Sequence, residues 1–431
     1  MQVSLYNTPD AAAALARIRS RSIQANPDLA ARVAEIVEGV RAGGDDALLR
    51  YTKQFDGVEL DRTQLRVEPD FIQESASRAA PRAIEAFRKA INNVRAFHER
   101  QVESSWSMQS DDGVVLGLRI LPVDSAGLYV PGGAAAYPSS LIMNVVPAQV
   151  AGVRRLAVTT PPGTLERSHE LAAVILELGI TEVYRVGGAQ AIAALAYGTE
   201  TIDKVSKIAG PGNVYVAIAK KLVYGSVGID SIAGPTEVVI LADGGANPSF
   251  VAADMLAQAE HDPAASAICI TTSEAAAREV KRQVDRQLGS LDRREIARAS
   301  IEQYGAVIVV ESLEEGCDLI NQIAPEHLEL MTARNDEAAE LIENAGAIFF
   351  GPWSSEPVGD YIAGPNHVLP TLGTSRFSSP LGVYDFVKRQ SVIRYTREAM
   401  AANRDRIAAM AQAEGLTAHA RAVLMRKTGS E

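Results

Sequence analysis

From about residue 115 onward the sequence alternates short apolar runs with amphipathic segments, and this pattern restricts its fold more than any other feature. The strand-like runs are residues 155–160, 182–186, 237–242, 267–271, 306–310 and 347–350. Between them, segments such as 168–178 and 275–288 repeat apolar residues with helical spacing. Strands that alternate with helices favour parallel sheets with helices on both faces. We therefore predict an α/β fold.

Three further segments complete this prediction. Residues 28–44 show helical periodicity that Gly43 and Gly44 interrupt, and the chain becomes helical again from about Ser379 to its end. Residues 125–153 carry no charged side chain, but their prolines would repeatedly break a membrane-spanning helix. We interpret this uncharged stretch as buried turns and strand ends.

Size and charge exclude several classes of protein. A chain of 431 residues exceeds the usual size of one hydrophobic core, so we expect two or more domains. The net charge of −11 argues against binding to nucleic acid or an anionic membrane, which requires a basic surface. The N-terminus lacks a secretory signal, and two cysteines cannot form a disulfide framework. We expect a cytoplasmic protein.

Two polar groups have the chemistry of metal ligands. Gln258 and His261 are three residues apart in a helical stretch, so their side chains can converge. A polar patch near a helix end explains the same spacing. Asp360 lies in the turn-rich segment 351–370, which has three glycines and four prolines and resembles a functional loop. An Asx turn or a helix cap is the alternative for this aspartate.

Adjacent Glu326 and His327 form a candidate acid–base pair. Pro325 suits the first turn of a helix, which would place Glu326 near the positive end of that helix. A carboxylate beside an imidazole supplies two titratable groups for proton transfer. Two polar side chains exposed at the surface, without a catalytic role, explain the pair equally well. In the tail, Glu414 and His419 are the polar exceptions within EGLTAHARAVLMR.

Glycine-rich turns form a second kind of candidate site. The four turns are residues 130–133, 186–190, 209–213 and 233–237. At least two follow a strand-like run and precede a helical one, where backbone N–H groups can bind phosphate. None matches GxGxxG, the common dinucleotide fingerprint. The turns therefore indicate some ligand at the carboxyl ends of parallel strands, or simply tight turns without a ligand.

Taken together, these segments resemble the histidinol dehydrogenase family over nearly the whole chain. The matching stretches are GLYVPGG (127–133), VGGAQAIAALAYGT (186–199), KIAGPGNVYV (207–216), AGPTEVVILAD (233–243), DMLAQAEHDP (254–263), APEHLEL (324–330), GDYIAGPNHVLPT (359–371) and EGLTAHA (414–420). Thr236 replaces the serine of many family members and keeps the hydroxyl group.

The resemblance implies two incomplete Rossmann-like domains with parallel sheets. It assigns 1–24 to an N-terminal helical segment, 25–128 with 238–380 to the first domain, 129–237 to the second, and 381–431 to a helical tail exchanged between two subunits. The implied assembly is a homodimer. His98 and His169 lie outside the matching stretches, and we expect them at the surface; His367 lies inside one, and we give it a structural role in its loop.

The resemblance also implies the contents of the site. One zinc ion per subunit would be bound by Gln258, His261, Asp360 and His419. Histidinol would contact these residues together with Thr236, His327 and Glu414, and NAD would contact Tyr129, Gln190 and Asn213. Two nitrogen and two oxygen donors without thiolate suit a borderline-hard metal site that accepts further ligands.

The implied reaction is oxidation of histidinol to histidine in two hydride transfers, at the end of histidine biosynthesis. His327 suits the base of both oxidations, and Glu326 suits the activation of water. Neither Cys269 nor Cys317 lies in a matching stretch, so we do not expect a covalent thiol intermediate. The alternatives are a relative that oxidises another small primary alcohol, a metallohydrolase, or a binding protein with a structural metal.

Overall fold

The computed structural model describes residues 1–21, 27–132 and 136–426. Residues 22–24 of the predicted N-terminal segment and Gly133 of the first glycine-rich turn lie outside these ranges. The chain divides into two compact units. The first comprises residues 1–101 and 124–386, and the second comprises residues 102–123 and 387–431.

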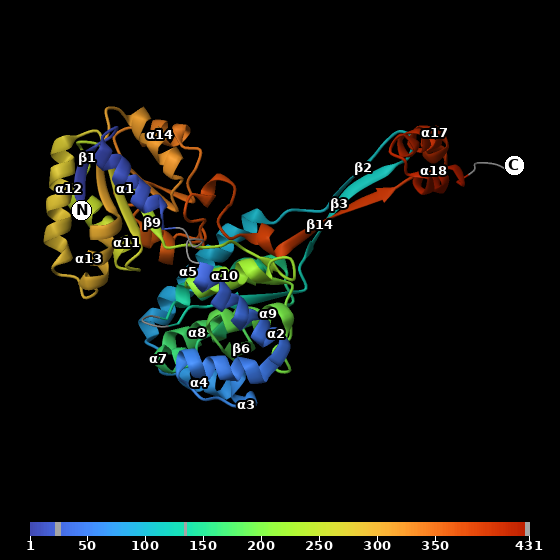
Figure 1. Cartoon of the computed structure of the whole chain (residues 1–431), viewed down its shortest axis with the longest axis horizontal. Helices are drawn as coiled ribbons and strands as arrows, with labels where there is room; N and C mark the ends of the chain where they lie inside the picture. The colour runs from blue at the N-terminus through green and yellow to red at the C-terminus, as the bar shows by residue number, and fades with distance from the viewer. Residues whose placement is uncertain (22–26, 133–135, 427–431) are drawn as a thin grey trace. The chain divides into compact units, whose positions relative to one another are not determined.

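A six-stranded parallel sheet organises one half of the first unit (Figure 1). Its order is β1 (Gln2–Leu5), β11 (Gly305–Val309), β10 (Ser266–Thr271), β9 (Glu237–Ala242), β12 (His327–Met331), β13 (Ala347–Phe350). Helices α11 (Pro248–Ala259), α12 (Glu274–Leu288) and α13 (Arg294–Tyr304) cover one face. Helices α1 (Pro9–Arg19), α14 (Leu313–Ile323) and α15 (Asn335–Leu341) cover the other. Because both faces are covered, β9 to β12 are buried along their whole length.

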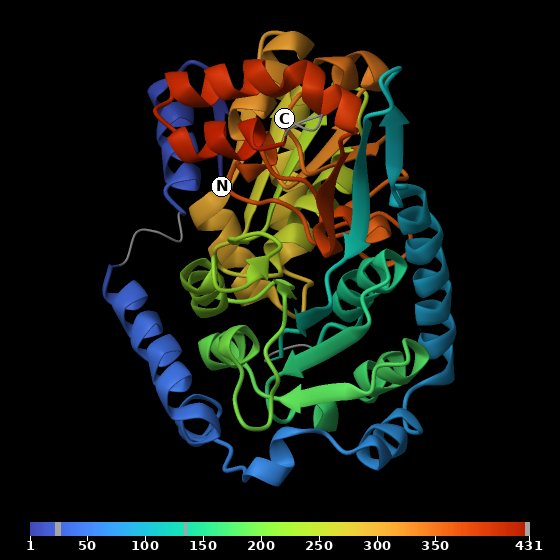
Figure 2. The ribbon, with the colours of Figure 1, turned by 90° about the vertical axis from the view of Figure 1, so that its right-hand side faces the viewer.

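A five-stranded parallel sheet organises the other half of this unit, and its green arrows can be followed in Figure 2. Its order is β6 (Glu182–Arg185), β5 (Arg155–Thr160), β4 (Ser125–Tyr129), β7 (Lys207–Ala209), β8 (Gly228–Ile229). Helices α2 (Pro27–Asp56), α9 (Gly188–Tyr197) and α10 (Val214–Val223) share one apolar core with this sheet. A second group of helices packs together beside it: α4 (Pro69–Ala76), α5 (Pro81–His98), α6 (Pro138–Ala151) and α8 (His169–Glu177). Short helices are α3 (Arg62–Leu65), α7 (Thr164–Arg167) and α16 (Glu356–Tyr361).

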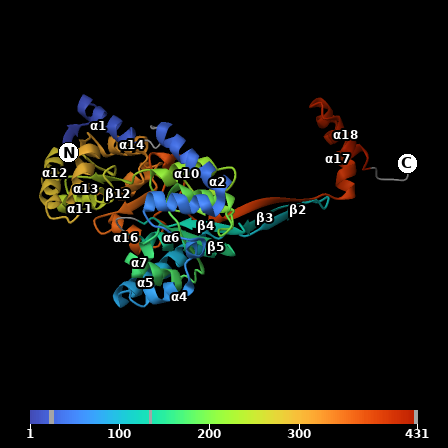
Figure 3. The same cartoon turned by 60° about the horizontal axis from the view of Figure 1, so that its bottom comes forward.

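The second unit is an antiparallel ribbon that ends in two helices, as Figure 3 shows. Strand β3 (Val115–Pro122) pairs with β2 (Trp106–Gln109) on one side and with β14 (Val387–Arg394) on the other. Helices α17 (Arg397–Ala413) and α18 (Thr417–Leu424) follow β14 and pack together through a small cluster formed mainly by alanine side chains.

The predicted α/β fold with two parallel sheets is confirmed, and so are the six strand-like runs, within one residue at each end. Two interpretations were wrong. Much of the uncharged stretch is helix α6, which Pro138 begins and which tolerates Pro147; it lacks charge because residues 139–148 are buried. The chain after Ser379 is not wholly helical, because β14 pairs with a strand far away in the sequence.

The predicted interruption at Gly43 and Gly44 is confirmed: Gly44 has a non-helical backbone (φ 51°, ψ −137°), and α2 is two helical pieces that meet at this kink. One local prediction needs correction. Glu326 and His327 are not in the first turn of a helix: α14 ends at Ile323 and His327 begins strand β12. The left-handed Ala324 caps α14, and Pro325 leads directly into the strand.

The predicted domain limits remain a prediction, because both parallel sheets belong to one compact unit. Two observations bear on them: α2 packs with the five-stranded sheet, and residues 102–123 join the tail in the second unit. Within the described ranges, no helix combines the length and apolar character needed to cross a membrane.

Candidate active site

The turn before β9 and the start of β12 form the centre of the candidate site. These strands are adjacent and parallel, with His327 opposite Val238, so their amino ends lie side by side. The buried Glu326 carboxylate accepts a hydrogen bond from the Thr236 hydroxyl at 2.5 Å and from the Glu237 main-chain N–H at 2.9 Å. The sheet register therefore joins two segments that are 90 residues apart in sequence.

His327 contacts the same turn through its ring. Its Nδ1 lies 3.2 Å from the Glu237 carbonyl oxygen, which can only accept, so Nδ1 carries the proton in this contact. Nε2 is buried and has no hydrogen-bond partner among the described residues. Burial lowers the pKa of His327 to about 4, which keeps the imidazole neutral. A neutral ring with a free Nε2 lone pair can act as a base.

Burial has the opposite effect on Glu326. It raises the pKa of this carboxyl to about 8, although the hydrogen bonds from Thr236 and Glu237 favour the charged form. The Glu326 carboxylate and the His327 ring lie 3.7 Å apart. Two neighbouring groups with displaced pKa values are suited to acid–base catalysis.

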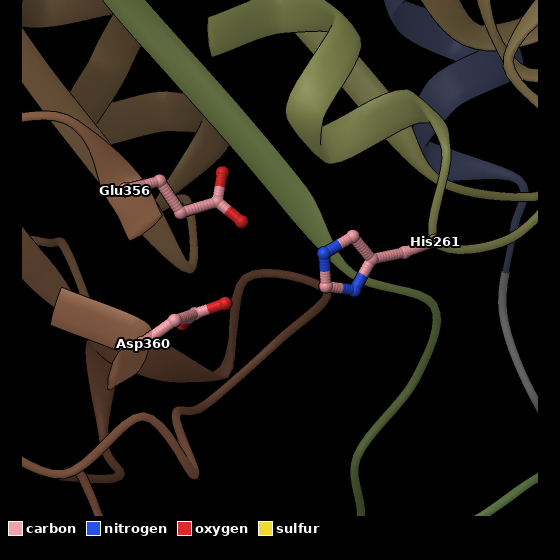
Figure 4. A group of neighbouring side chains, drawn as sticks. All are labelled: His261, Glu356 and Asp360. Carbon is pink, nitrogen blue, oxygen red and sulfur yellow. The ribbon is translucent and has the colours of Figure 1, made fainter. Parts of the chain in front are cut away.

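A candidate metal site lies in the same half of the unit. His261, Glu356 and Asp360 each offer one possible ligand atom, and these three atoms all lie within 4.8 Å of one another. Figure 4 shows the His261 ring pointing toward the two carboxylates. His261 comes just after α11, whereas Glu356 and Asp360 are four residues apart on α16 and project from it together.

The Gln258 amide connects this group to the Thr236 hydroxyl. Gln258 is fully buried on α11, and its side chain lies between Thr236 and the Glu356 carboxylate. If Nε2 faces Glu356, the amide donates to that carboxylate at 2.7 Å. If Oε1 faces Glu356, two acceptors meet, and only a proton or a cation between them makes that orientation favourable.

The charges around this group fit a cation. Among the described residues, no lysine or arginine forms an ion pair with Glu326, Glu356 or Asp360. Burial, and then the neighbouring Asp360 carboxylate, raise the pKa of Glu356 well above its ordinary value. A divalent ion would offset this repulsion, and imidazole, carboxylate and amide oxygen are suitable ligands for zinc.

Glu356 was missed in the sequence. The available signal was its spacing of four residues from Asp360, which puts both on one face of α16. Behind it lie Glu329, whose carboxylate accepts the Glu356 main-chain N–H at 2.9 Å, and Asp254. Burial raises the pKa of both carboxyls, and the neighbouring Asp254 carboxylate raises that of Glu329 further. Both residues lie in matching stretches, Asp254 in 254–263 and Glu329 in 324–330, but no spacing in the sequence indicates that they meet.

His367 has the structural role expected of it. Its Nδ1 lies 3.0 Å from the Asp360 carbonyl oxygen and 3.7 Å from the Asp360 carboxylate, and its Nε2 lies 3.4 Å from the Ser140 hydroxyl. These contacts orient the segment that carries Asp360. His98, expected at the surface, is fully buried between α5 and this segment, where its ring contacts the Val94 carbonyl and Asn366.

The three predicted NAD contacts line one cavity at the carboxyl edge of the five-stranded sheet. Its volume is about 450 Å³, and Asp56 and Arg167 line it together with Tyr129, Gln190 and Asn213. Tyr129 ends β4 and its hydroxyl accepts the Gly188 N–H at 3.1 Å. Asn213 caps α10. Turns at the carboxyl ends of parallel strands are the usual place for a nucleotide.

The turn 209–213 beside this cavity is held by a buried ion pair between Lys220 and Asp230. The Lys220 ammonium donates to the Gly210 carbonyl at 3.0 Å, and the Gly210 N–H donates to the Asp230 carboxylate at 2.8 Å. Gly210 has a φ of 119°, and a Cβ there would clash with the Tyr129 backbone. The turn therefore requires glycine.

The fourth glycine-rich turn is different. Residues 233–237 precede β9, so the turn that carries Thr236 lies at the amino edge of the six-stranded sheet, where Glu326 and His327 also lie. The expectation of a ligand at carboxyl ends fits the turns of the five-stranded sheet only. The loop after α11 returns the chain to the same amino edge, which explains why His261 comes close to this turn.

Two predicted site residues belong to the second unit. Glu414 caps the end of α17 and His419 lies on α18, so both belong to the second unit, where they are exposed. Their assignment to the metal and substrate stays a prediction. Cys269 and Cys317 are buried, and burial raises the pKa of these thiols to about 12 and about 11. Neither is suited to act as a nucleophile.

Comparison with known proteins identifies the family. The sequence pattern of the family described as histidinol dehydrogenase matches residues 19–427. The histidinol dehydrogenase of Geobacillus kaustophilus is 55% identical over 397 residues, which cover 91% of this chain and 93% of that protein. That of Bacillus subtilis is 52% identical over 398 residues, with 92% of each chain covered.

A solved structure extends the likeness to the fold. The crystal structure of histidinol dehydrogenase from Elizabethkingia anophelis matches with a TM-score of 0.91 and 36% sequence identity, covering 99% of this chain and 98% of that one. The chain therefore belongs to the histidinol dehydrogenase family, and it is an oxidoreductase.

Proposed function

We propose that the chain oxidises L-histidinol to L-histidine through L-histidinal and uses two molecules of NAD. In the first oxidation the alcohol loses a proton and a hydride and becomes the aldehyde. Addition of water gives the aldehyde hydrate, which loses a second proton and hydride and becomes the acid. This reaction is the end of histidine biosynthesis, and it is the activity that the family name denotes.

The observation that carries the proposal is the state of His327. Its Nδ1 is engaged by the Glu237 carbonyl and its Nε2 is free, so Nε2 takes the alcohol proton in the first oxidation and the hydrate proton in the second. Burial keeps the ring neutral before each transfer. Glu326, beside it, takes a proton from the water that adds to the aldehyde.

Gln258, His261, Asp360 and the predicted ligand His419 would hold one zinc ion per subunit. When bound, zinc supplies Lewis-acid positions that hold and orient the imidazole and amino groups of the substrate. Glu356 lies within the same group of ligand atoms, and its carboxylate either contributes to the site or holds the Gln258 amide. The Thr236 hydroxyl is hydrogen-bonded to both the Glu326 carboxylate and the Gln258 amide, and so it sets the separation of these two side chains.

NAD, when bound, accepts a hydride in each oxidation. Tyr129, Gln190 and Asn213 line the cavity at the five-stranded sheet and would hold the dinucleotide there without the GxGxxG fingerprint. Arg167 lines the same cavity and supplies a positive charge for the phosphates.

We further propose a cytoplasmic homodimer in which the tails are exchanged, so that Glu414 and His419 of one subunit complete the substrate site of the other. Support comes from the second unit, which carries these residues on its own helices.

The proposal is tested with a panel of substrates. Purified protein loaded with zinc is given NAD and either histidinol or another small primary amino alcohol, and NADH and product are measured. We expect kcat/KM for histidinol to exceed that for the other alcohols by about 10²-fold or more, because a site that binds the substrate's polar groups rejects analogues that lack them. Equal rates would favour a relative with another substrate, and no NADH with any alcohol would favour a hydrolase or a binding protein.

A further inference from the structure

A buried ion pair lies directly behind the turn that contacts Glu326 and His327. The Arg21 guanidinium, just after α1, donates to the Glu237 carboxylate at 2.5 Å, and the two side chains are only 1% and 6% exposed. The Leu372 main-chain N–H donates to the other carboxylate oxygen at 3.0 Å. The Glu237 side chain is therefore fixed at both of its oxygens.

The main chain of Glu237 forms a hydrogen bond with each of the two proposed catalytic residues, Glu326 and His327. The Glu237 N–H donates to the Glu326 carboxylate, and the Glu237 carbonyl accepts from the His327 ring. A rotation of this one residue would displace both contacts at once. The orientation of two side chains thus depends on the position of Glu237, which its own side chain helps to determine.

Arg21 also connects the segments that surround the site. Its other nitrogens donate to the carbonyl of Ala264 at 3.0 Å, in the loop that carries His261, and to the carbonyl of Ile18 at 2.9 Å. A longer contact of 3.4 Å reaches the Thr236 carbonyl. Leu372, on the carboxylate side, directly follows the segment that carries Asp360. The pair therefore joins three segments of the candidate site.

Stability alone is a weak explanation for this pair. Moving two charges out of water is costly, and a buried ion pair is often no more stabilising than apolar side chains of the same volume. An ion pair with several hydrogen bonds does, however, restrict the positions of the main-chain segments that it joins. Small displacements of catalytic groups slow reactions strongly.

We infer that Arg21 and Glu237 are positioning residues for Glu326 and His327, an inference that rests on the proposed function of that pair. Neither side chain touches the reacting atoms. They act through the Glu237 peptide group, and their loss should slow both oxidations, because both catalytic side chains depend on it.

The test uses Arg21→Met, Glu237→Gln and the conservative Arg21→Lys, each in the full-length protein with saturating zinc. Arg155→Met is the matched control: it removes a partly buried arginine that pairs with Glu182 in the five-stranded sheet, remote from this turn. For each protein we would measure kcat and KM from histidinol and from histidinal, the KM for NAD, and the melting temperature.

We expect kcat to fall about tenfold or more in both half-reactions for Arg21→Met and Glu237→Gln, with the KM for NAD unchanged. Arg21→Lys should recover part of the loss, because it keeps the charge but not the forked geometry. The double variant should be about as slow as the slower single variant, since both substitutions break one connection.

The inference is overturned if the folded Glu237→Gln and Arg21→Met proteins keep kcat within about twofold of the starting protein. It is also overturned if activity falls only in proportion to the folded fraction, as read from melting. If Arg21→Met does not fold, Glu237→Gln and Arg21→Lys decide. Failure of the proposed function is a separate result, in which the unmodified protein and Arg155→Met also form no NADH from histidinol.

Discussion

His327 donates a hydrogen bond from Nδ1 to the main-chain carbonyl of Glu237 across 3.2 Å, and this contact fixes which nitrogen of the ring is free. The carbonyl cannot donate, so the proton resides on Nδ1 and the lone pair on Nε2. The contact exists because β12 begins at His327, beside the start of β9. Sheet register therefore determines the tautomer of the proposed base.

The buried state of His327 predicts a dependence of stability on pH. In the folded protein His327 takes up a proton only when the pH falls to about 4, whereas in the unfolded chain it does so at about pH 6.5. The free energy of unfolding should therefore fall as the pH decreases through this window, by at most about 1.4 kcal/mol per pH unit. Urea unfolding of the starting protein and of His327→Gln across the window checks this. The variant should lose less stability toward low pH, and parallel curves would contradict the burial argument.

Glu326→Gln should separate the two oxidations. Glutamine keeps the size of the side chain but cannot take a proton from water, so oxidation of added histidinal should slow by about 10²-fold or more, while the alcohol step is affected less. The two half-reactions are measured by NADH formation in single turnovers. Glu177→Gln, an exposed carboxylate paired with Arg88, is the control. An equal loss in both half-reactions would refute this division of roles.

Removal of zinc should abolish turnover but leave NAD binding nearly unchanged. The proposed ligands Gln258, His261 and Asp360 lie around the six-stranded sheet, whereas the NAD cavity lies at the five-stranded sheet. Chelated protein, with its metal content measured, is titrated with NAD and then assayed with histidinol before and after zinc is restored. Normal turnover by protein shown to be free of metal would disprove the role of zinc.

The sequence predicted most of the parallel architecture, because buried parallel strands are continuous apolar runs and the helices between them are amphipathic. Runs such as 155–160 and 237–242 match β5 and β9 at both ends. Prediction from the sequence failed where contacts between distant segments determine the secondary structure. Helix α6 is buried on all sides and contains a proline, and β14 is a strand only because β3 lies beside it.

The site was predictable by resemblance more than by spacing. Gln258, His261 and Asp360 come together as expected, but the structure adds Glu356 to them, and it places Glu326 and His327 at a strand rather than a helix. The contact between Glu237 and the catalytic pair depends on strand register, and the partner of Arg21 is 216 residues away. No local pattern indicates either contact.

The tail exchange predicts complementation between inactive variants. If each site combines His261 of one subunit with His419 of the other, then His261→Ala and His419→Ala homodimers are both inactive. In a mixed dimer one site receives both lesions and the other none. Random assortment of equal amounts makes half of the dimers mixed, so activity should recover to about a quarter of the unmodified protein.

The complementation experiment unfolds and refolds the two variants together, beside separately refolded controls. Differently tagged chains, purified through both tags, establish that mixed dimers have formed. If such dimers are present and their activity equals that of the separate controls, each site is built within one chain, and the exchange of Glu414 and His419 is wrong.

The most direct test of the account is the stoichiometry of the complete reaction. A limiting, known amount of L-histidinol is incubated with zinc-loaded protein and excess NAD until absorbance stops changing, and NADH, histidinal and histidine are quantified. We predict two NADH and one histidine for each histidinol, with no accumulated aldehyde, because one pair of side chains serves both oxidations. One NADH per histidinol with histidinal as the final product would contradict the account, and so would the absence of NADH.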